Sequence, residues 1–259
     1  MRIHAPAKLN LCLYLGPRRG DRLHELCSLF EPLALADLIE VGEGESDEVA
    51  CPCVEGENLA ARALAALRER GWDRPPLRVE IEKRIPVAAG LGGGSADAAA
   101  ILRLARDPAA GGSGEIPDLA AIAAELGADI PSQLVPALSL VLGAGERVER
   151  LPAPAPHAAV LLPGGGGLST AAVFAAAARL GLGRGGEKLD ELAGRLREAA
   201  GSGASPLDYA ELLANDLEPA ARSLRPDIGA ALDALREAGA PLAFLTGSGP
   251  TAVGLFPTI

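Results

Sequence analysis

The chain has 259 residues, 49% of them hydrophobic, and a formal net charge of −10 at pH 7. This length allows one large domain or two modest ones, and the acidic balance argues against nucleic acid or an anionic membrane as a partner. The sequence contains no uncharged apolar run of about 18 residues, so no membrane span is predicted. The N-terminus, MRIHAPAKLN, lacks the continuous apolar stretch of a signal peptide, so we expect a cytoplasmic protein.

The first part of the chain mixes strand and helix patterns. In chain order, these patterns predict strands at 9–15 and 26–39, an acidic loop at 40–49, a helix at 58–70, a strand at 77–85, helices at 95–106 and 119–126, and between these two helices a Pro/Gly/Ser linker at 107–117. Asn58 is the expected N-cap of the first helix. The clearest strand is LRVEIEKRI at 77–85, because apolar and polar residues alternate throughout it.

The second part begins with a strand and contains the expected domain boundary. Its patterns predict a strand at 138–142, a turn at 143–148, a strand at 159–163, helices near 169–181, 187–199, 216–224 and 227–238, and a final strand, turn and strand over 242–256. The Pro-rich segment LPAPAPH divides the chain into domains 1–152 and 153–259. Strands and helices do not alternate regularly, which favours an α+β fold.

A glycine-rich loop, PVAAGLGGGSADAA at 86–99, joins the clearest strand to a helix. Glycines let the backbone approach a ligand closely, and the first amides of a helix bind anions, so the loop predicts a phosphate site. A Walker loop is excluded because Ser95 and Ala96, not Lys and Ser/Thr, follow Gly94. A dinucleotide fingerprint is excluded because residue 95 is serine. The run GGGG at 164–167 is a weaker candidate for anion binding.

Three motifs in order make the chain resemble the GHMP small-molecule kinases. They are APAKLNLCL at 5–13, the glycine loop, and LTGSGPTAVGLF at 245–256. The resemblance implies a two-domain α+β fold, with an N-terminal part like the second domain of ribosomal protein S5 and a ferredoxin-like C-terminal part. It also implies phosphoryl transfer from ATP with Mg²⁺, and assigns no metal ligand and no oligomeric state.

The resemblance places ATP along the loop and at two residues outside it. The implied ATP-binding residues are Asn58, Lys83, Pro86, Val87, Ala88, Ala89, Gly90, Leu91, Gly92, Gly93, Gly94, Ser95 and Ala96. The Ser95 hydroxyl is available to a phosphate or to Mg²⁺, and it is also a candidate helix N-cap. Asp97 is expected to be structural, because the helix dipole stabilises a carboxylate in the first helical turn.

Asp129 and Lys8 match the catalytic aspartate and lysine of the family. The cation would keep Asp129 ionised and lower the pKa of the attacking hydroxyl. A simpler interpretation makes Asp129 the N-cap of a helix that starts near Pro131.

Within the family, the blocks GDRLHEL, ENLAARA and GADIP resemble those of kinases that phosphorylate a cytidine diphosphate-linked methylerythritol, in non-mevalonate isoprenoid synthesis. The implied substrate-binding residues are Asn10, His24, Phe174, Gly247, Ser248 and Gly249, with His24 and Phe174 at the cytosine ring. Relatives often have a tyrosine where this chain has Leu23, and usually carry one more helix after the segment that ends here at Ile259.

Two other classes of function stay open from the sequence. Leu23 allows a GHMP kinase with a different acceptor, and the fold allows a nucleotide-binding protein without catalysis, although Lys8 and Asp129 disfavour the latter. The pair Cys51 and Cys53 is too closely spaced for an ordinary zinc site and lacks a second ligand pair, so we expect reduced thiols.

Overall fold

The computed structural model describes residues 1–21, 23–52, 54, 56–107 and 117–258. Its contacts divide the chain into two compact units that interleave along the sequence. Unit 1 comprises Met1–Lys8, Pro32–Val87 and Gly92–Pro136, and unit 2 comprises Leu9–Glu31, Ala88–Leu91 and Ala137–Ile259. Within the described ranges, every helix is too short or too polar to span a lipid bilayer.

The strands β1 (Arg2–Arg18) and β2 (His24–Glu43) are long and pair with each other. In unit 1, the end of β2 pairs antiparallel with β4 (Leu77–Glu82), so that Leu38 lies opposite Glu82. The short β3 (Glu48–Ala50) runs parallel to β4 on its other side. Val79 and Ile81 of β4 are buried while Arg78, Glu80 and Glu82 are exposed, as the alternating sequence predicts.

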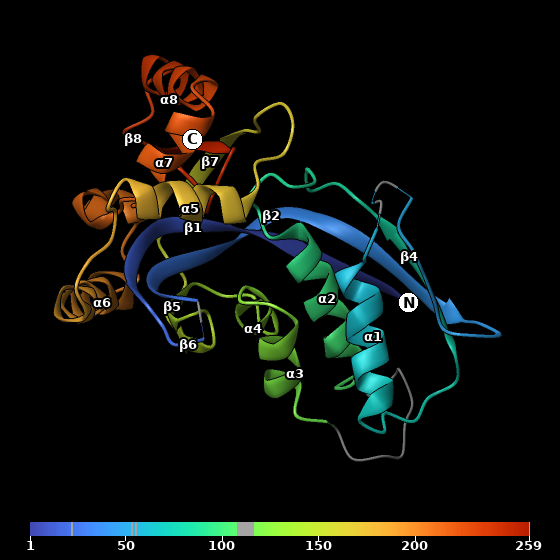
Figure 1. The fold of residues 1–259 in the computed structure, drawn as a ribbon. Helices are drawn as coiled ribbons and strands as arrows, with labels where there is room; N and C mark the ends of the chain where they lie inside the picture. Colours follow the sequence, from blue (N-terminus) through green and yellow to red (C-terminus); the bar gives the residue numbers. More distant parts are fainter. Residues whose placement is uncertain (22, 53, 55, 108–116, 259) are drawn as a thin grey trace. The chain divides into compact units, whose positions relative to one another are not determined.

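Among the described residues of unit 1, four helices accompany these strands, with α1 and α2 side by side (Figure 1). They are α1 (Leu59–Glu69), α2 (Gly93–Leu104), α3 (Leu119–Leu126) and α4 (Ile130–Gln133). The Asn58 side chain caps α1 by accepting a hydrogen bond from the Ala60 amide at 2.8 Å. The alanine-rich α2 is buried along most of its length, and together with Ile39 and Val79 it forms one hydrophobic core.

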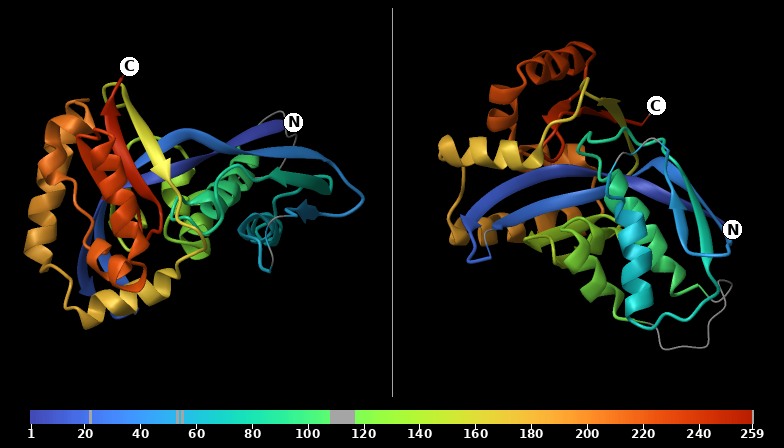
Figure 2. Two further views of the ribbon diagram at one scale, coloured as in Figure 1. Left: turned by 90° about the horizontal axis from the view of Figure 1, so that it is seen from above. Right: turned by 45° about the vertical axis from the view of Figure 1, so that its right-hand side comes forward.

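Unit 2 contains two sets of strands. In the first, β5 (Ser139–Gly143) pairs with the start of β2 and with β6 (Arg147–Arg150). In the second, β9 (Ala252–Pro257) lies between β7 (His157–Leu162) and β8 (Leu242–Leu245) and is antiparallel to both (Figure 2).

The helical elements of unit 2 follow β7 along the chain. They are α5 (Thr170–Arg179), α6 (Gly186–Gly201), the 3₁₀ segment η2 (Pro206–Leu212), α7 (Glu218–Leu224) and α8 (Asp227–Glu237). Helix α8 packs on β8 and β9. Its Leu232 and Leu235 join Leu245 in the core of this unit.

Several expectations need correction. The acidic loop expected at 40–49 is wrong, because β2 continues to Glu43 and β3 begins at Glu48. The expected turn at 143–148 overlaps β6, and η2 was not expected. The N-cap of α2 is Gly92 rather than Ser95. Residues 108–116 of the expected linker and Cys53 lie outside the described residues. The expected boundary between residues 152 and 153 coincides with no unit boundary and stays a prediction.

Candidate active site

The glycine loop runs directly into the N-terminus of α2, where hydrogen-bond donors lack acceptors. Gly92 is the N-cap, with φ of 70°, and its carbonyl accepts from the Ala96 amide at 2.8 Å. The N–H groups of Gly93, Gly94 and Ser95 meet no acceptor in the part of the chain that the structure describes. Unpaired amides at the positive end of a helix dipole form an anion-binding site.

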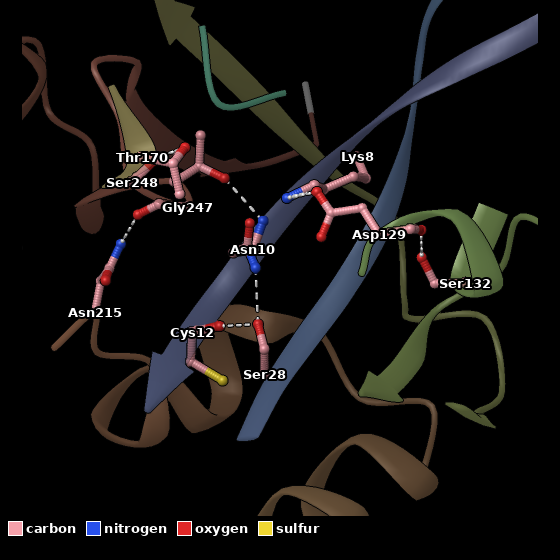
Figure 3. Close-up of polar contacts among 11 residues, drawn as sticks. Lys8, Asn10, Cys12, Ser28, Asp129, Ser132, Thr170, Asn215, Gly247 and Ser248 are labelled. Carbon is pink, nitrogen blue, oxygen red and sulfur yellow. Dashed lines mark hydrogen bonds and ion pairs between the residues drawn. The ribbon is translucent and has the colours of Figure 1, made fainter. Parts of the chain in front are cut away.

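Lys8 and Asp129 form an ion pair within unit 1 (Figure 3). The distance from Lys8 Nζ to Asp129 Oδ2 is 3.2 Å, and the lysine side chain is buried. Asp129 occupies the N-cap position of α4, yet its carboxylate makes no capping hydrogen bond. The interpretation of Asp129 as a simple cap is therefore wrong, and its carboxylate is oriented toward the lysine instead.

The stem of Lys8 lies against the glycine loop. A Cβ atom placed on Gly92 would come within 2.9 Å of both Cγ and Cε of Lys8. Gly92 is therefore required for two reasons, its left-handed backbone conformation and the close approach of the lysine. This contact places the Lys8–Asp129 pair next to the unpaired amides of α2.

Lys83 is held by two buried aspartates, Asp37 and Asp97. Lys83 Nζ lies 2.8 Å from Asp97 Oδ2 and also pairs with Asp37, whose other oxygen accepts from the amides of Arg84 and Ile85. Burial raises the pKa of Asp97 to about 6, opposed by Lys83 and reinforced by Asp37. Burial alone would lower the pKa of Lys83, but the two carboxylates outweigh it and raise that pKa.

This cluster lies beside the loop, since a Cβ on Gly93 would meet Lys83 Nζ at 3.1 Å. Lys83 is paired with two aspartates, and its expected role toward adenosine stays a prediction. Asn58 uses its side-chain oxygen as the cap of α1. Of the remaining loop residues in unit 1, Val87 is exposed and Ala96 is buried.

In unit 2, the first part of the loop packs on the final glycine-rich turn, residues 246–250. A Cβ on Gly90, whose φ is 80°, would come within 2.9 Å of the carbonyl oxygens of Thr246 and Gly249. Thr251 Oγ1 donates to the Ala89 carbonyl at 2.7 Å. Two segments that were matched independently to kinase motifs are therefore in direct contact.

The turn itself holds a second group of unpaired amides. The Gly249 amide donates to the Thr246 carbonyl at 3.0 Å, and Thr246 Oγ1 accepts from the Asn10 amide at 2.8 Å. Gly247 and Ser248 are buried, and their N–H groups find no acceptor among the described residues. Buried amides without a protein acceptor are free to bind water, an ion or a ligand.

Two further predicted residues lie together in unit 2. The rings of His24 and Phe174 are 5.6 Å apart and tilted by 42°. His24 Nδ1 lies 3.3 Å from the Gly16 carbonyl, so the other ring nitrogen can face a ligand. Leu23, next to His24, is 54% exposed. The aromatic pair can hold a planar base, with Leu23 at the surface beside it.

The Asn10 side chain is held in place, and the weaker glycine run packs on the same turn. Asn10 Nδ2 donates to Ser28 Oγ at 2.9 Å (Figure 3). A Cβ on Gly164 would meet Pro250 at 2.8 Å. The carbonyls of residues 165 and 166 accept hydrogen bonds from Arg225. The run at 164–167 thus supports the final turn.

Comparison with known proteins gives the class to which this arrangement belongs. The family description "GHMP kinases N terminal domain" matches residues 58–136, and "GHMP kinases C terminal" matches residues 187–258. The chain belongs to the GHMP kinase family, and its α+β architecture is the one expected from the three motifs.

Individual relatives narrow the comparison. The 4-diphosphocytidyl-2-C-methyl-D-erythritol kinase of Anaeromyxobacter sp. (strain K) is 39% identical over 268 residues, which cover 98% of this chain and 80% of the relative. The enzyme of that name from Streptomyces avermitilis is 39% identical over 260 residues, covering 96% and 85%.

Solved structures agree with these matches. A crystal structure of 4-(cytidine 5'-diphospho)-2C-methyl-D-erythritol kinase has a TM-score of 0.78 and 35% identity, covering 98% of this chain and 90% of that one. The homoserine kinase of Cytophaga hutchinsonii has a TM-score of 0.66 at 18% identity, covering 100% and 85%, and shows the shared fold alone.

Proposed function

We propose that the chain transfers the γ-phosphoryl group of ATP to the 2-hydroxyl of 4-diphosphocytidyl-2-C-methyl-D-erythritol, in non-mevalonate isoprenoid precursor synthesis. The observation that carries the proposal is the buried Lys8, which pairs with Asp129 while its stem lies against Gly92 of the phosphate loop. The relatives at 39% identity support this acceptor.

In this reaction, the acceptor oxygen attacks the γ-phosphorus, the bond to the bridging oxygen breaks, and ADP leaves. Asp129 accepts the proton of the hydroxyl, and its carboxylate is one-third exposed, so a ligand can reach it. Lys8 holds this carboxylate in place and stabilises the developing negative charge. Phosphoryl transfer depends mainly on positioning and charge neutralisation, which a lysine–aspartate pair beside a phosphate loop can supply.

The nucleotide phosphates bind at the unpaired amides of Gly93, Gly94 and Ser95. Ser95 is the third residue of α2, and its hydroxyl would be available to Mg²⁺ or to a phosphate. When bound, Mg²⁺ neutralises charge on the phosphates and is held largely by their oxygens. Asn58 and Lys83 are assigned to the adenosine side of this site.

The diphosphate of the acceptor binds at the amides of Gly247 and Ser248, and cytosine binds beside His24 and Phe174. Asn10 completes the acceptor site. We further propose that residues 1–152 and 153–259 correspond to the two domains of the family, and that the protein acts in the cytoplasm.

A coupled ADP-release assay with a panel of hydroxyl acceptors tests the proposal, with ³¹P NMR to identify the product. Turnover with the diphosphocytidyl acceptor and a new phosphomonoester signal are expected. Turnover only with another acceptor would assign a different kinase of the family. ATP binding without turnover on any acceptor would indicate a non-catalytic nucleotide-binding protein.

A further inference from the structure

Asn215 lies in the segment between η2 and α7, which is fastened to β1 within unit 2. Leu13 and Asn215 form a parallel β-bridge. The Leu13 amide donates to the Ala214 carbonyl at 2.9 Å, and the Asp216 amide donates to the Leu13 carbonyl at 2.8 Å. The Asp216 carboxylate also accepts two hydrogen bonds from Arg184, at 2.6 and 2.7 Å. Residue 215 is therefore held on a fixed backbone.

The Asn215 side chain binds the backbone on both sides of Thr246, where the chain enters the glycine-rich turn. Its Nδ2 donates to the Leu245 carbonyl at 2.7 Å and to the Gly247 carbonyl at 2.8 Å, and Figure 3 shows the second contact. Its Oδ1 accepts from the Leu217 amide at 2.9 Å. The residue is buried, and the side-chain amide thus uses both hydrogens and its oxygen.

The geometry points to Asn215 as a positioning residue for the acceptor diphosphate, an inference that rests on the proposed function. By engaging the Leu245 and Gly247 carbonyls, Asn215 fixes the peptide units 245–246 and 247–248, the second of which carries the Ser248 N–H group. The amides of Gly247 and Ser248, which meet no acceptor in the described part of the chain, are then preorganised for an anion. Asn215 itself does not touch the ligand.

Only a primary amide fits all three partners at this position. Two carbonyl oxygens require two donors on one side of the side chain, and the Leu217 amide requires an acceptor on the other. An aspartate of the same shape would still accept the hydrogen bond from the Leu217 amide, but its second carboxylate oxygen would face two carbonyl oxygens and repel them. A leucine of the same shape would remove all three bonds without adding charge.

Calorimetric titrations of the full chain with CDP and with cytidine test this role. Cytidine lacks the phosphates, so a defect in the turn must weaken CDP and spare cytidine. We expect Asn215→Leu and Asn215→Asp each to bind CDP about tenfold more weakly, with cytidine binding unchanged. Where Asn215→Leu is shown unfolded by circular dichroism, Asn215→Asp carries the test, because it retains the bond to Leu217.

Tyr14→Phe is the matched control. Tyr14 donates a buried hydrogen bond from its hydroxyl to the Leu212 carbonyl, which lies in the same unit but outside the 246–250 turn. Its loss should lower the melting temperature and leave CDP affinity unchanged. The inference would be overturned, without affecting the proposed function, by either of two results. One is an equal loss of affinity for CDP and for cytidine in the Asn215 variants, and the other is wild-type CDP affinity in both variants. A wild-type chain that binds no CDP would overturn the proposed function together with it.

Discussion

Gly92→Ala is the sharpest single perturbation of the proposed catalytic pair, because one methyl group acts on both loop and lysine. Gly92 has φ of 70°, a conformation that costs an alanine roughly 1–2 kcal/mol. The added carbon would also lie 2.9 Å from Lys8 Cγ and Cε, where carbon atoms normally stay about 3.5–4.0 Å apart.

The clash cannot be relieved by the lysine tip alone. Cγ lies near the start of the side chain, so relief must shift the whole stem by about half an ångström or more. The ammonium lies 3.2 Å from Asp129, and a displacement of that kind changes the geometry of the pair. Misplacement of catalytic groups by about 1 Å can cost 10²-fold in rate. We therefore expect kcat to fall about 10- to 100-fold, with stability lowered by about 1–2 kcal/mol.

Gly94→Ala is the matched control for the stability part of this argument. A Cβ on Gly94 would meet only Leu59 Cδ1, at 3.6 Å, and no left-handed φ is required there. Alanine inside a helix is favoured over glycine by up to about 1 kcal/mol, so Gly94→Ala should unfold at the same denaturant concentration as wild type or a higher one. Urea unfolding and steady-state kinetics measure both effects. Normal kcat in Gly92→Ala, or equal destabilisation by both alanines, would refute the reasoning.

Three further predictions follow from other contacts. Asp129→Asn should lower kcat about 10²- to 10⁴-fold with unchanged ATP affinity in calorimetry, and near-normal turnover would remove Asp129 from the chemistry. The pKa of Asp97, raised to about 6 by burial, means that the contribution of Asp97 to stability falls as pH rises from about 4 to 6. Asp97→Asn should remove this contribution while keeping the Lys83–Asp37 pair, so its melting temperature should gain on that of wild type from pH 4 to 6, and parallel melting-temperature profiles would contradict the assignment. Leu23→Tyr should lower KM for the cytidyl acceptor about fivefold or more through stacking, with kcat unchanged; an unchanged KM would place residue 23 outside the base site.

The sequence predicted elements well where local signals were strong. Helix α1 follows its N-cap Asn58, and α3 occupies the expected 119–126. The sequence did not predict the strands that depend on pairing with a neighbouring strand rather than on their own residue pattern. These are β3, with three residues, and β6, with four. Such short, partly exposed segments have too little periodicity to be distinguished from loops.

The site shows a similar division. The glycine loop and the motifs around Lys8 and Asp129 are short continuous stretches of sequence. They could therefore be proposed as site residues from the sequence alone. Asp37 and Asn215 were missed, because each acts on residues more than 25 positions away. Asp37 sits in an apolar strand and Asn215 in a loop, and only the tertiary contacts reveal them.

The distribution of lysines shows how an acidic chain can bind two polyanions. All three lysines are paired with carboxylates: Lys8 with Asp129, Lys83 with Asp37 and Asp97, and Lys188 with Glu191. Lys8 and Lys83, which lie beside the glycine loop, are therefore already paired, and in the proposed function the phosphates bind at backbone amides at the start of α2 and in the 246–250 turn. Amide dipoles carry no net charge and need no counterion, so they act through fixed geometry. Binding should consequently depend more on the shape of these two glycine-rich segments than on ionic strength.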